Sequence, residues 1–145
     1  MELTYKSAKA EDIEPVYALC KALIEKYEQP ETVDLPKVLR WVRHKIETSI
    51  GEYTVVCADG RKAGYYHFYK NEDGMFELDD LYVFPEFQNR GIGSAVIQKC
   101  CGSVQTPVML YVFIRNSRAV ELYKRMGFEV TETIKDSRFI MRYEK

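Results

Sequence analysis

A seven-residue segment with two glycines is the feature of this chain that most clearly suggests a ligand. It lies between a predicted strand and a predicted helix and contains Gly91 and Gly93. Backbone N–H groups at the start of a helix are unpaired and carry partial positive charge, and glycine lets a ligand approach them closely. A tight strand-to-helix turn without a ligand is the alternative. The segment predicts a cradle for a phosphate or pyrophosphate, made of Gln88, Asn89, Arg90, Gly91, Ile92, Gly93 and Ser94.

A tyrosine and an asparagine on a later predicted helix supply groups for proton transfer and ligand binding. Asn116 and Tyr123 are two helical turns apart and share one face of that helix. Tyrosine offers a phenolic proton, and asparagine binds a ligand amide or caps the helix. The alternative is structural, with Asn116 as the N-cap alone and Tyr123 as a core residue.

Three carboxylates, Glu77, Asp79 and Asp80, lie close together on the predicted strand before the glycine segment. This acidity is local, because the chain as a whole has a net charge of −1. Such a cluster favours a cationic ligand and offers a base for proton transfer. The alternatives are solvated or ion-paired carboxylates, or carboxylates that alternate between the two strand faces so that only one reaches a cleft.

The strand that carries these carboxylates has an irregular apolar pattern. Phe76 and Leu78 are apolar on one parity, whereas Leu81 and Val83 are apolar on the other. Because strand side chains alternate between faces, the pattern slips near Asp80. One extra residue there, a β-bulge, would bring both pairs to the same face. The alternative is a strand that is covered on both faces and has no slip.

A histidine on the preceding predicted strand has two possible uses. His67 shares one strand face with Tyr65 and Tyr69. This pattern favours packing against neighbouring strands, and a place in the wall of an acceptor pocket is the alternative.

Hydrophobic periodicity predicts the elements that must position these residues. Two long apolar stripes near the N-terminus predict helices, with Asp34 marking the start of the second. Asp59-Gly60 is a two-residue hairpin signal, and Gly127 closes the last helix. The order of elements predicts a mixed α/β fold with an antiparallel meander in its first half. The predicted helices are 10–28, Leu35–Ser49, one from the glycine segment to about Cys101, and Asn116–Met126; the predicted strands are Leu3–Lys6, Tyr53–Ala58, Arg61–Tyr69, Met75–Val83, Val108–Ile114, Phe128–Glu132 and Arg138–Tyr143.

Composition indicates one globular domain over residues 1–145, with 46% apolar and 30% charged residues. The basic surplus that selects nucleic acid or an anionic membrane is missing. The start of the chain lacks a signal-peptide pattern, and no apolar run reaches the roughly 20 residues that span a bilayer, so we expect a cytoplasmic protein. Zinc-site spacing is also missing, and buried thiols without a metal are predicted for Cys20, Cys57, Cys100 and Cys101.

Taken together, these motifs resemble the GNAT family of N-acetyltransferases, most closely from Glu77 to Phe128. The resemblance implies a mixed, mostly antiparallel sheet with a bulged and splayed central strand and helices on both faces. It also implies that the Gln88-x-x-Gly91-x-Gly93 loop binds the pyrophosphate of acetyl-CoA. The remaining cofactor contacts that it implies come from Asn116, Tyr123 and three residues of the strand before the loop. Those three pair their backbone with pantetheine and are Leu81, Tyr82 and Val83.

The resemblance further implies transfer of an acetyl group to a primary amine by direct attack in a ternary complex. Tyr123 matches the family's general acid. Glu77 lies at the spacing of a catalytic glutamate in some relatives and is the better candidate base, with Asp80 as its rival. Asp79 and Asp80 are expected to bind the acceptor, a small molecule or a peptide amine. A homodimer stays possible, and composition and residue spacing lead us to expect no nucleic-acid, membrane or metal partner.

Two other classes of function compete with this interpretation. A catalytically silent acyl-CoA-binding module would keep the glycine cradle and lose the acid and base, yet Tyr123 and Glu77 are both present. A regulatory domain that binds nucleotide phosphates would require a P-loop ending, and the Lys-Ser/Thr pair of that motif is missing.

Overall fold

The computed structural model describes residues 1–29, 31 and 33–144. Short 3-10 turns occur at Ala10–Asp12, Ile50–Glu52 and Pro85–Phe87. The helices are α1 (Ile13–Tyr27), α2 (Leu35–Ser49), α3 (Ile92–Gly102) and α4 (Ser117–Arg125). The strands are β1 (Leu3–Ser7), β2 (Tyr53–Ala58), β3 (Arg61–Lys70), β4 (Phe76–Val83), β5 (Val108–Phe113), β6 (Glu129–Ile134) and β7 (Arg138–Tyr143).

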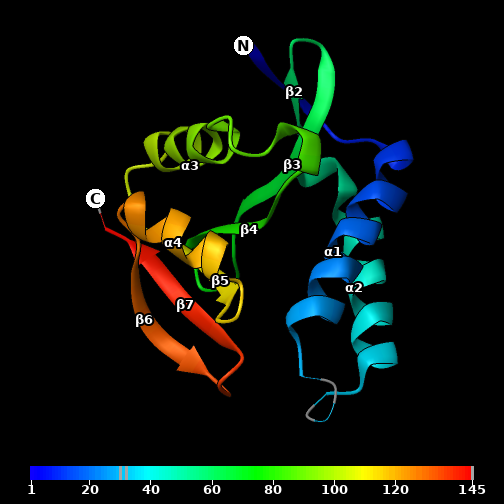
Figure 1. Cartoon of the computed structure of the whole chain (residues 1–145), viewed down its shortest axis with the longest axis vertical. Helices are drawn as coiled ribbons and strands as arrows, with labels where there is room; N and C mark the ends of the chain where they lie inside the picture. Colours follow the sequence, from blue (N-terminus) through cyan, green and yellow to red (C-terminus); the bar gives the residue numbers. More distant parts are fainter. Residues whose placement is uncertain (30, 32, 145) are drawn as a thin grey trace.

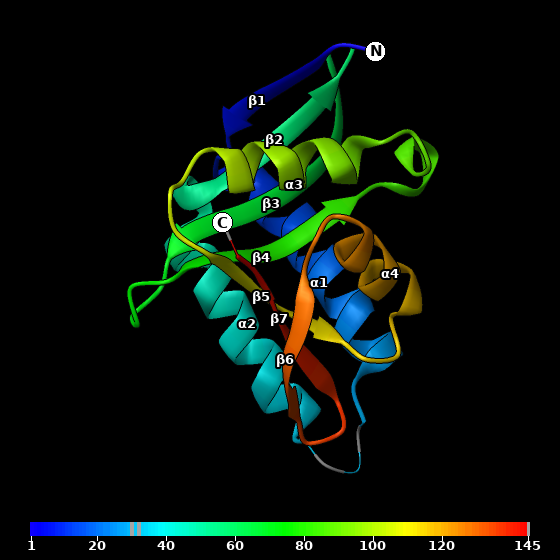
Figure 2. The ribbon, with the colours of Figure 1, turned by 90° about the vertical axis from the view of Figure 1, so that its left-hand side faces the viewer.

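The strands form one seven-stranded sheet in the order β1-β2-β3-β4-β5-β7-β6. Neighbouring strands are antiparallel except β4 and β5, which are parallel. Figures 1 and 2 show α1 and α2 on one face of this sheet and α3 and α4 on the other. The predicted mixed, mostly antiparallel sheet with helices on both faces is therefore confirmed.

Each face of the sheet has its own hydrophobic core. The apolar stripes predicted for the first two helices are buried at Val16 of α1 and Ile46 of α2, and they pack on Val55 and Tyr65 of the sheet. On the opposite face α3 and α4 cover a second core that includes Val96, Ile97, Val120, Leu110, Phe128 and Met141. All four cysteines are buried in these two cores, as predicted.

The predicted bulge lies in β4. Tyr65 pairs with Tyr82 and His67 pairs with Asp79, so one residue of β3 faces two residues of β4 between these pairs. Asp80 is one of those two and has a positive φ of 55°. The extra residue brings both apolar pairs of β4 to the core under α3 and α4, so the interpretation without a slip is wrong: these residues are Phe76, Leu78, Leu81 and Val83.

A close approach between β3 and β4 accompanies this bulge. A Cβ placed on Gly64 would lie only 2.1 Å from the carbonyl oxygen of Tyr82, a distance that no side chain tolerates. Glycine at this position therefore allows β3 to pack directly against the bulged strand.

The strands β4 and β5 separate soon after they meet, as the sequence resemblance implies. They are paired only at Phe76 with Val108 and at Glu77 with Met109. Beyond Glu77, the described chain offers β4 no strand partner on this side. The splay leaves a row of backbone polar groups facing the gap between the two strands.

Small differences from the predicted boundaries have local causes. Met75 precedes β4 because its N–H donates to the Asn71 side chain in a turn, at 3.0 Å. Phe128 precedes β6 because its N–H donates to the carbonyl of Tyr123, while the N–H of Gly127 donates to Lys124. These two bonds form a Schellman motif that ends α4 at the predicted glycine, whose φ is 99°. Across the described residues, no helix is both long enough and apolar enough to cross a membrane.

Candidate active site

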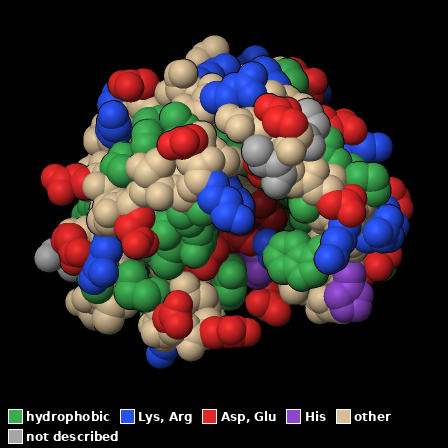
Figure 3. Space-filling view, turned by 90° about the horizontal axis from the view of Figure 1, so that it is seen from below, with side chains coloured by type: hydrophobic (Ala, Val, Ile, Leu, Met, Phe, Trp, Pro, Cys, Tyr) green, Lys and Arg blue, Asp and Glu red, His purple; other side chains and the backbone are tan. Residues whose placement is uncertain are grey.

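A cavity of about 190 Å³ opens where β4 and β5 separate. In Figure 3 a hollow on the face seen from below has acidic side chains deep inside it and hydrophobic and basic side chains at its edge. The cavity brings together four predicted site residues that lie outside the glycine segment and have polar side chains. They are Asp79, Asp80, Asn116 and Tyr123. Its wall also contains Leu81 and Tyr82 of β4, together with Cys20, Leu23, Ile24, Trp41, Val42, Lys45, Leu78, Tyr111, Val112, Phe113, Ala119 and Arg138.

The glycine segment forms the start of α3, as predicted. Gly91 is the N-cap of α3 and has a φ of 81°, in the region that favours glycine. A Cβ added at Gly91 would meet no atom within 4 Å, so the space beside this backbone is open. The N–H groups of a first helical turn beside open space are the arrangement expected of an anion cradle.

The second glycine of the segment has a different surrounding. A Cβ at Gly93 would lie 3.2 Å from the side chain of Leu122 on α4. Gly93 thus permits close packing of α3 on α4, a structural use that requires no ligand. The open space lies beside Gly91.

Arg118 of α4 holds the glycine segment in place. Its guanidinium donates to the side-chain oxygen of Gln88 and to that of Asn89, both at 2.8 Å. Gln88 in turn donates to the carbonyl of Val83, the last residue of β4, at 3.0 Å. The contacts connect α4, the loop and the splayed strand, and they place a cation beside the predicted phosphate cradle.

Tyr123 lies at the inner wall of the cavity and is 8% exposed. Its ring packs edge-on against Phe128, with the ring centroids 5.8 Å apart. Burial raises the pKa of the Tyr123 hydroxyl, and the charges of Asp80 and Asp79 raise it further. The hydroxyl is therefore protonated at neutral pH and is available as a hydrogen-bond donor.

Asn116 is the N-cap of α4, as the structural alternative predicts, and it also borders the cavity. Its side chain caps α4 by accepting from the N–H of Ala119 at 3.3 Å. The same residue forms part of the cavity wall. Capping and ligand contact are thus compatible at this position.

Two of the three predicted carboxylates form a cluster with Lys45, a residue of α2. The Lys45 ammonium forms an ion pair with Asp79 and lies 3.6 Å from the Oδ2 atom of Asp80. Asp80 also accepts from the hydroxyls of Tyr53, at 2.7 Å, and Tyr82, at 2.9 Å. Because both carboxylates contact α2, the alternative in which they point to opposite faces of the strand is wrong.

The two carboxylates have opposite pKa shifts. Burial, followed by repulsion from Asp79, raises the pKa of Asp80. For Asp79 burial acts in the same direction, but contacts with His67 and Lys45 outweigh it and lower the pKa. Asp79 is thus the permanent counter-ion of Lys45, whereas Asp80 has the higher proton affinity that a base requires.

Glu77 lies outside the described wall of the cavity. It is 7% exposed and belongs to the part of β4 that is still paired with β5. Its side chain accepts from Asn71 at 3.2 Å and hydrogen-bonds Tyr69. Burial raises the pKa of this carboxyl. Any proton exchange between Glu77 and the cavity therefore requires an intervening group.

Several residues at the site escaped the sequence analysis. Lys45 could have been noticed, because it is a charged residue three positions after Val42, on the apolar stripe of α2. Arg118 gave no local signal, since its partners are about thirty residues away in the chain. Trp41, which is 65% exposed, and Arg138 also border the cavity.

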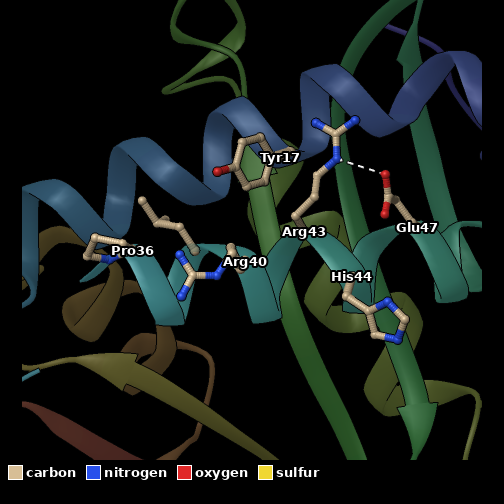
Figure 4. Close-up of a pocket in the computed structure, with 7 residues that line it drawn as sticks. Tyr17, Pro36, Arg40, Arg43, His44 and Glu47 are labelled. Carbon is tan, nitrogen blue, oxygen red and sulfur yellow. Dashed lines mark hydrogen bonds and ion pairs between the residues drawn. The ribbon is translucent and has the colours of Figure 1, made fainter. Parts of the chain in front are cut away.

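A second hollow, of about 380 Å³, lies on the outer surface of α1 and α2. Figure 4 shows Tyr17 of α1 beside Arg40, Arg43 and Glu47 of α2 there, with Arg43 bonded to Glu47. The predicted cofactor and acid–base residues are not part of this hollow. Among the described residues, no group of His, Cys, Asp and Glu was found that could hold a metal ion.

Comparison with known proteins matches a family model to the part of the chain that contains the glycine segment, β4 and α4. The acetyltransferase (GNAT) family model matches residues 16–128. An uncharacterized N-acetyltransferase of Methanocaldococcus jannaschii is 40% identical over 63 residues, which are 41% of this chain and 28% of that protein. A thialysine N-epsilon-acetyltransferase of Bos taurus is 30% identical over 91 residues, 57% of this chain and 51% of that protein. The chain thus spans about half or less of these curated relatives.

Solved structures share the fold at low sequence identity. The PaiA N-acetyltransferase of Thermoplasma acidophilum, in complex with coenzyme A, has a TM-score of 0.75 and 20% identity over 100% of both chains. A GNAT-family acetyltransferase of Streptococcus agalactiae has a TM-score of 0.77 and 14% identity, covering 99% of this chain and 95% of the other.

Proposed function

Because the chain belongs to the acetyltransferase (GNAT) family, we propose that it transfers an acetyl group from acetyl-CoA to a primary amine by direct attack in a ternary complex. One observation carries the proposal: the Tyr123 hydroxyl, the Asp80 carboxylate and the unpaired part of β4 border a single cavity. A silent binding module would not require an acid and a base at the same cavity. We propose that residues 1–145 act as one catalytic domain.

The residues around the splay suit acetyl-CoA in three ways. The open side of Gly91 and the first turn of α3 would hold the pyrophosphate, next to the charge of Arg118. The backbone of Leu81, Tyr82 and Val83 would pair with the pantetheine amides, because the described residues offer it no strand partner on the side of β5. Acetyl-CoA supplies the reactive thioester, and the protein positions it and moves the protons.

The acceptor amine must lose a proton before it attacks. An alkyl amine has a pKa of about 10.4, so making it neutral at pH 7 costs about 4.6 kcal/mol. We propose that Asp80 takes this proton, since it borders the cavity and burial raises its pKa. Glu77, the candidate favoured by its sequence spacing, would reach the amine only through water.

Tyr123 would serve the leaving group. As the C–S bond breaks, its hydroxyl would donate to the developing thiolate of coenzyme A. Because burial raises the Tyr123 pKa, complete transfer before bond cleavage is unfavourable. The proposal is therefore a proton donated in step with C–S cleavage, in a site from which water is excluded.

A pair of variants at one glycine tests the cofactor site. Acetyl-CoA should raise the melting temperature of the wild-type protein, by mass action on the folded state. Asparagine and aspartate have the same shape and both tolerate a positive φ, so Gly91→Asn is a matched control for Gly91→Asp. Gly91→Asp places a negative charge in the cradle. The Kd for acetyl-CoA should therefore be at least about tenfold higher in Gly91→Asp than in Gly91→Asn, a difference of roughly 1.4 kcal/mol in binding free energy. Differential scanning fluorimetry over a range of acetyl-CoA concentrations measures the two affinities. Equal shifts in melting temperature for the two variants would show that the pyrophosphate does not bind at this loop.

The acidic wall also makes a prediction about the acceptor. Lys45 offsets part of the charge of Asp79 and Asp80, so we expect a modest preference for acceptors with a second cationic group. The kcat/KM for cadaverine should exceed that for n-pentylamine by about fivefold, the scale of a partly screened ion pair near 1 kcal/mol. Added salt should reduce the advantage. Thialysine belongs in the same panel, because the bovine relative is named for it. Equal kcat/KM for cadaverine and n-pentylamine at low salt would rule out the preference for a second cationic group.

A further inference from the structure

Lys45 is a largely buried cation on the face of α2 that packs against the sheet. It lies between Val42 and Ile46 in the chain, which are both buried in the core beneath α2. The Lys45 side chain is itself only 24% exposed. Removing an ammonium group from water costs free energy, and an apolar side chain would pack at such a position without that cost. Packing of α2 therefore does not explain why this residue is charged.

Two carboxylates of the bulge share the Lys45 ammonium. It forms an ion pair with Asp79 and lies 3.6 Å from the Oδ2 atom of Asp80, and all three residues border the cavity. The side chains of Asp79 and Asp80 are 19% and 14% exposed, so water screens the repulsion between them poorly. One cation thus offsets the charge of two neighbouring carboxylates at the place where the acceptor amine would arrive.

The hydroxyls and the thiol that contact Asp80 or border the same cavity are uncharged at neutral pH, because burial raises the pKa of each. They come from five elements and are Cys20 of α1, Tyr53 of β2, Tyr82 of β4, Tyr111 of β5 and Tyr123 of α4. Arg138 of β7 also borders the cavity. Among the described residues, however, Lys45 is the only cation within ion-pair distance of Asp80.

His67 of β3 faces Asp79 rather than Asp80. Its imidazole is stacked on Tyr53 at 4.5 Å and on Tyr69 at 4.3 Å between ring centroids, and the residue is 2% exposed. The predicted packing against a neighbouring strand is thus confirmed, since Tyr53 is the partner of His67 on β2. The Nδ1 atom of His67 lies 3.6 Å from the Oδ2 atom of Asp79. A protonated His67 would therefore offset the charge of Asp79 and leave Asp80 dependent on Lys45.

We propose that Lys45 is the positioning residue that keeps Asp80 ionised until the acceptor amine arrives, an inference that rests on the proposed function. With both carboxylates ionised, the cluster of Lys45, Asp79 and Asp80 has one net negative charge, which the ammonium of a single acceptor neutralises. Without Lys45, repulsion between the carboxylates would favour a proton on one of them. That one would be Asp80, because its pKa is raised by burial and by the Asp79 charge, whereas contacts with His67 and Lys45 lower the pKa of Asp79.

The protons of the reaction balance with Lys45 charged throughout. Asp80 takes one proton from the acceptor ammonium, and the neutral nitrogen attacks the thioester. As the N–C bond forms and the C–S bond breaks, Tyr123 protonates the sulfur and recovers a proton from the nitrogen. Asp80 borders the cavity, so it returns its own proton to water once the amide has left. Lys45 thus acts through Asp80 and exchanges no proton itself.

Two variants of this cluster should move the acidic limb of the kcat/KM profile in opposite directions. Lys45→Met retains an unbranched side chain and removes the charge, so the limb should move up by about 1–3 pH units, with kcat/KM recovering at alkaline pH. Asp79→Asn removes the repulsion on Asp80 and leaves Lys45 to that carboxylate alone, so the limb should move down. A purely structural defect would lower kcat/KM at every pH and would not reverse its direction between the two variants.

Two further variants serve as controls. Lys45→Arg retains a cation and should keep the acidic limb close to its wild-type position. Lys37→Met removes an exposed lysine from the same helix and should leave the whole profile unchanged. Each profile is measured with the best amine of the panel. Acetyl-CoA thermal shifts in parallel report whether each variant is folded and binds the cofactor.

The position of the acidic limb decides the proposal. A wild-type limb in Lys45→Met would overturn it and leave the proposed function intact. If Lys45→Met does not fold, the comparison is made in Asp79→Asn, where a single carboxylate of the pair is left: adding Lys45→Met there should move the limb up again, and an unmoved limb would overturn the proposal. A wild-type protein that binds acetyl-CoA and acetylates no amine would overturn the proposed function, and the role of Lys45 with it.

Discussion

Replacing Tyr123 with phenylalanine should lower kcat by about 10²–10⁴-fold, the usual contribution of a general acid. The substitution removes a single oxygen atom. The ring keeps its edge-on contact with Phe128. The Schellman motif that ends α4 uses the backbone carbonyl of residue 123 and not its side chain. We therefore expect the fold and the acetyl-CoA affinity to be retained, so that the loss is specific to the chemical step. Steady-state kinetics with the best amine of the panel, together with acetyl-CoA thermal shifts, measure the two properties separately.

Tyr66→Phe provides the matched control for this experiment. Tyr66 is 6% exposed and belongs to the same core as Tyr123, but it lies away from the cavity. It should retain wild-type kcat. Equal kcat in the Tyr123 and Tyr66 variants would exclude Tyr123 as the proton donor. Because burial raises the Tyr123 pKa, kcat in the wild type should also persist at alkaline pH beyond the usual range of tyrosine.

The features of the fold that depend on local patterns could be predicted from the sequence. The slip in apolar parity along β4 is a local signal, and it located the bulge beside Asp80. Asp59-Gly60 similarly predicted the hairpin between β2 and β3, since both residues adopt the positive φ that its turn requires. Gly127 predicted the end of α4 for the same reason.

The surroundings of the site residues could not be predicted in the same way. Lys45 is 34 residues from Asp79 in the chain, and only the packing of α2 on the sheet brings them together. The spacing of Glu77 from the glycine segment says nothing about where β4 and β5 separate, yet that point places Glu77 outside the cavity wall and Asp80 within it. Gly91 and Gly93 look equivalent in the sequence, and their different neighbours depend on the contact between α3 and α4.

The choice of base rests on this difference in position. Asp80 borders the cavity and has a pKa raised by burial and by the Asp79 charge, whereas Glu77 is buried behind it with Asn71. A base acts only in its ionised form, so kcat/KM should rise with pH through the raised pKa of Asp80. A folded-state pKa above the unfolded value also means that the stability contributed by Asp80 is present at low pH and is lost as pH rises through the folded value. Ionisation of the buried Asp80 side chain therefore costs stability.

Asp80→Asn should consequently lower kcat/KM at neutral pH by about 10²–10⁴-fold without unfolding the protein. The amide keeps the shape of the carboxylate: its oxygen can still accept from one of the Tyr53 and Tyr82 hydroxyls, and its NH2 group can donate to the oxygen of the other. Asp79 remains as the partner of Lys45. The melting temperature of Asp80→Asn should fall less with rising pH than that of the wild type, because the buried group that ionises is gone. The acidic limb of the kcat/KM profile that belongs to Asp80 should disappear, leaving the dependence set by the acceptor amine. Glu77→Gln is the matched comparison and should change kcat/KM far less; the reverse order of effects would assign the base to Glu77 acting through water.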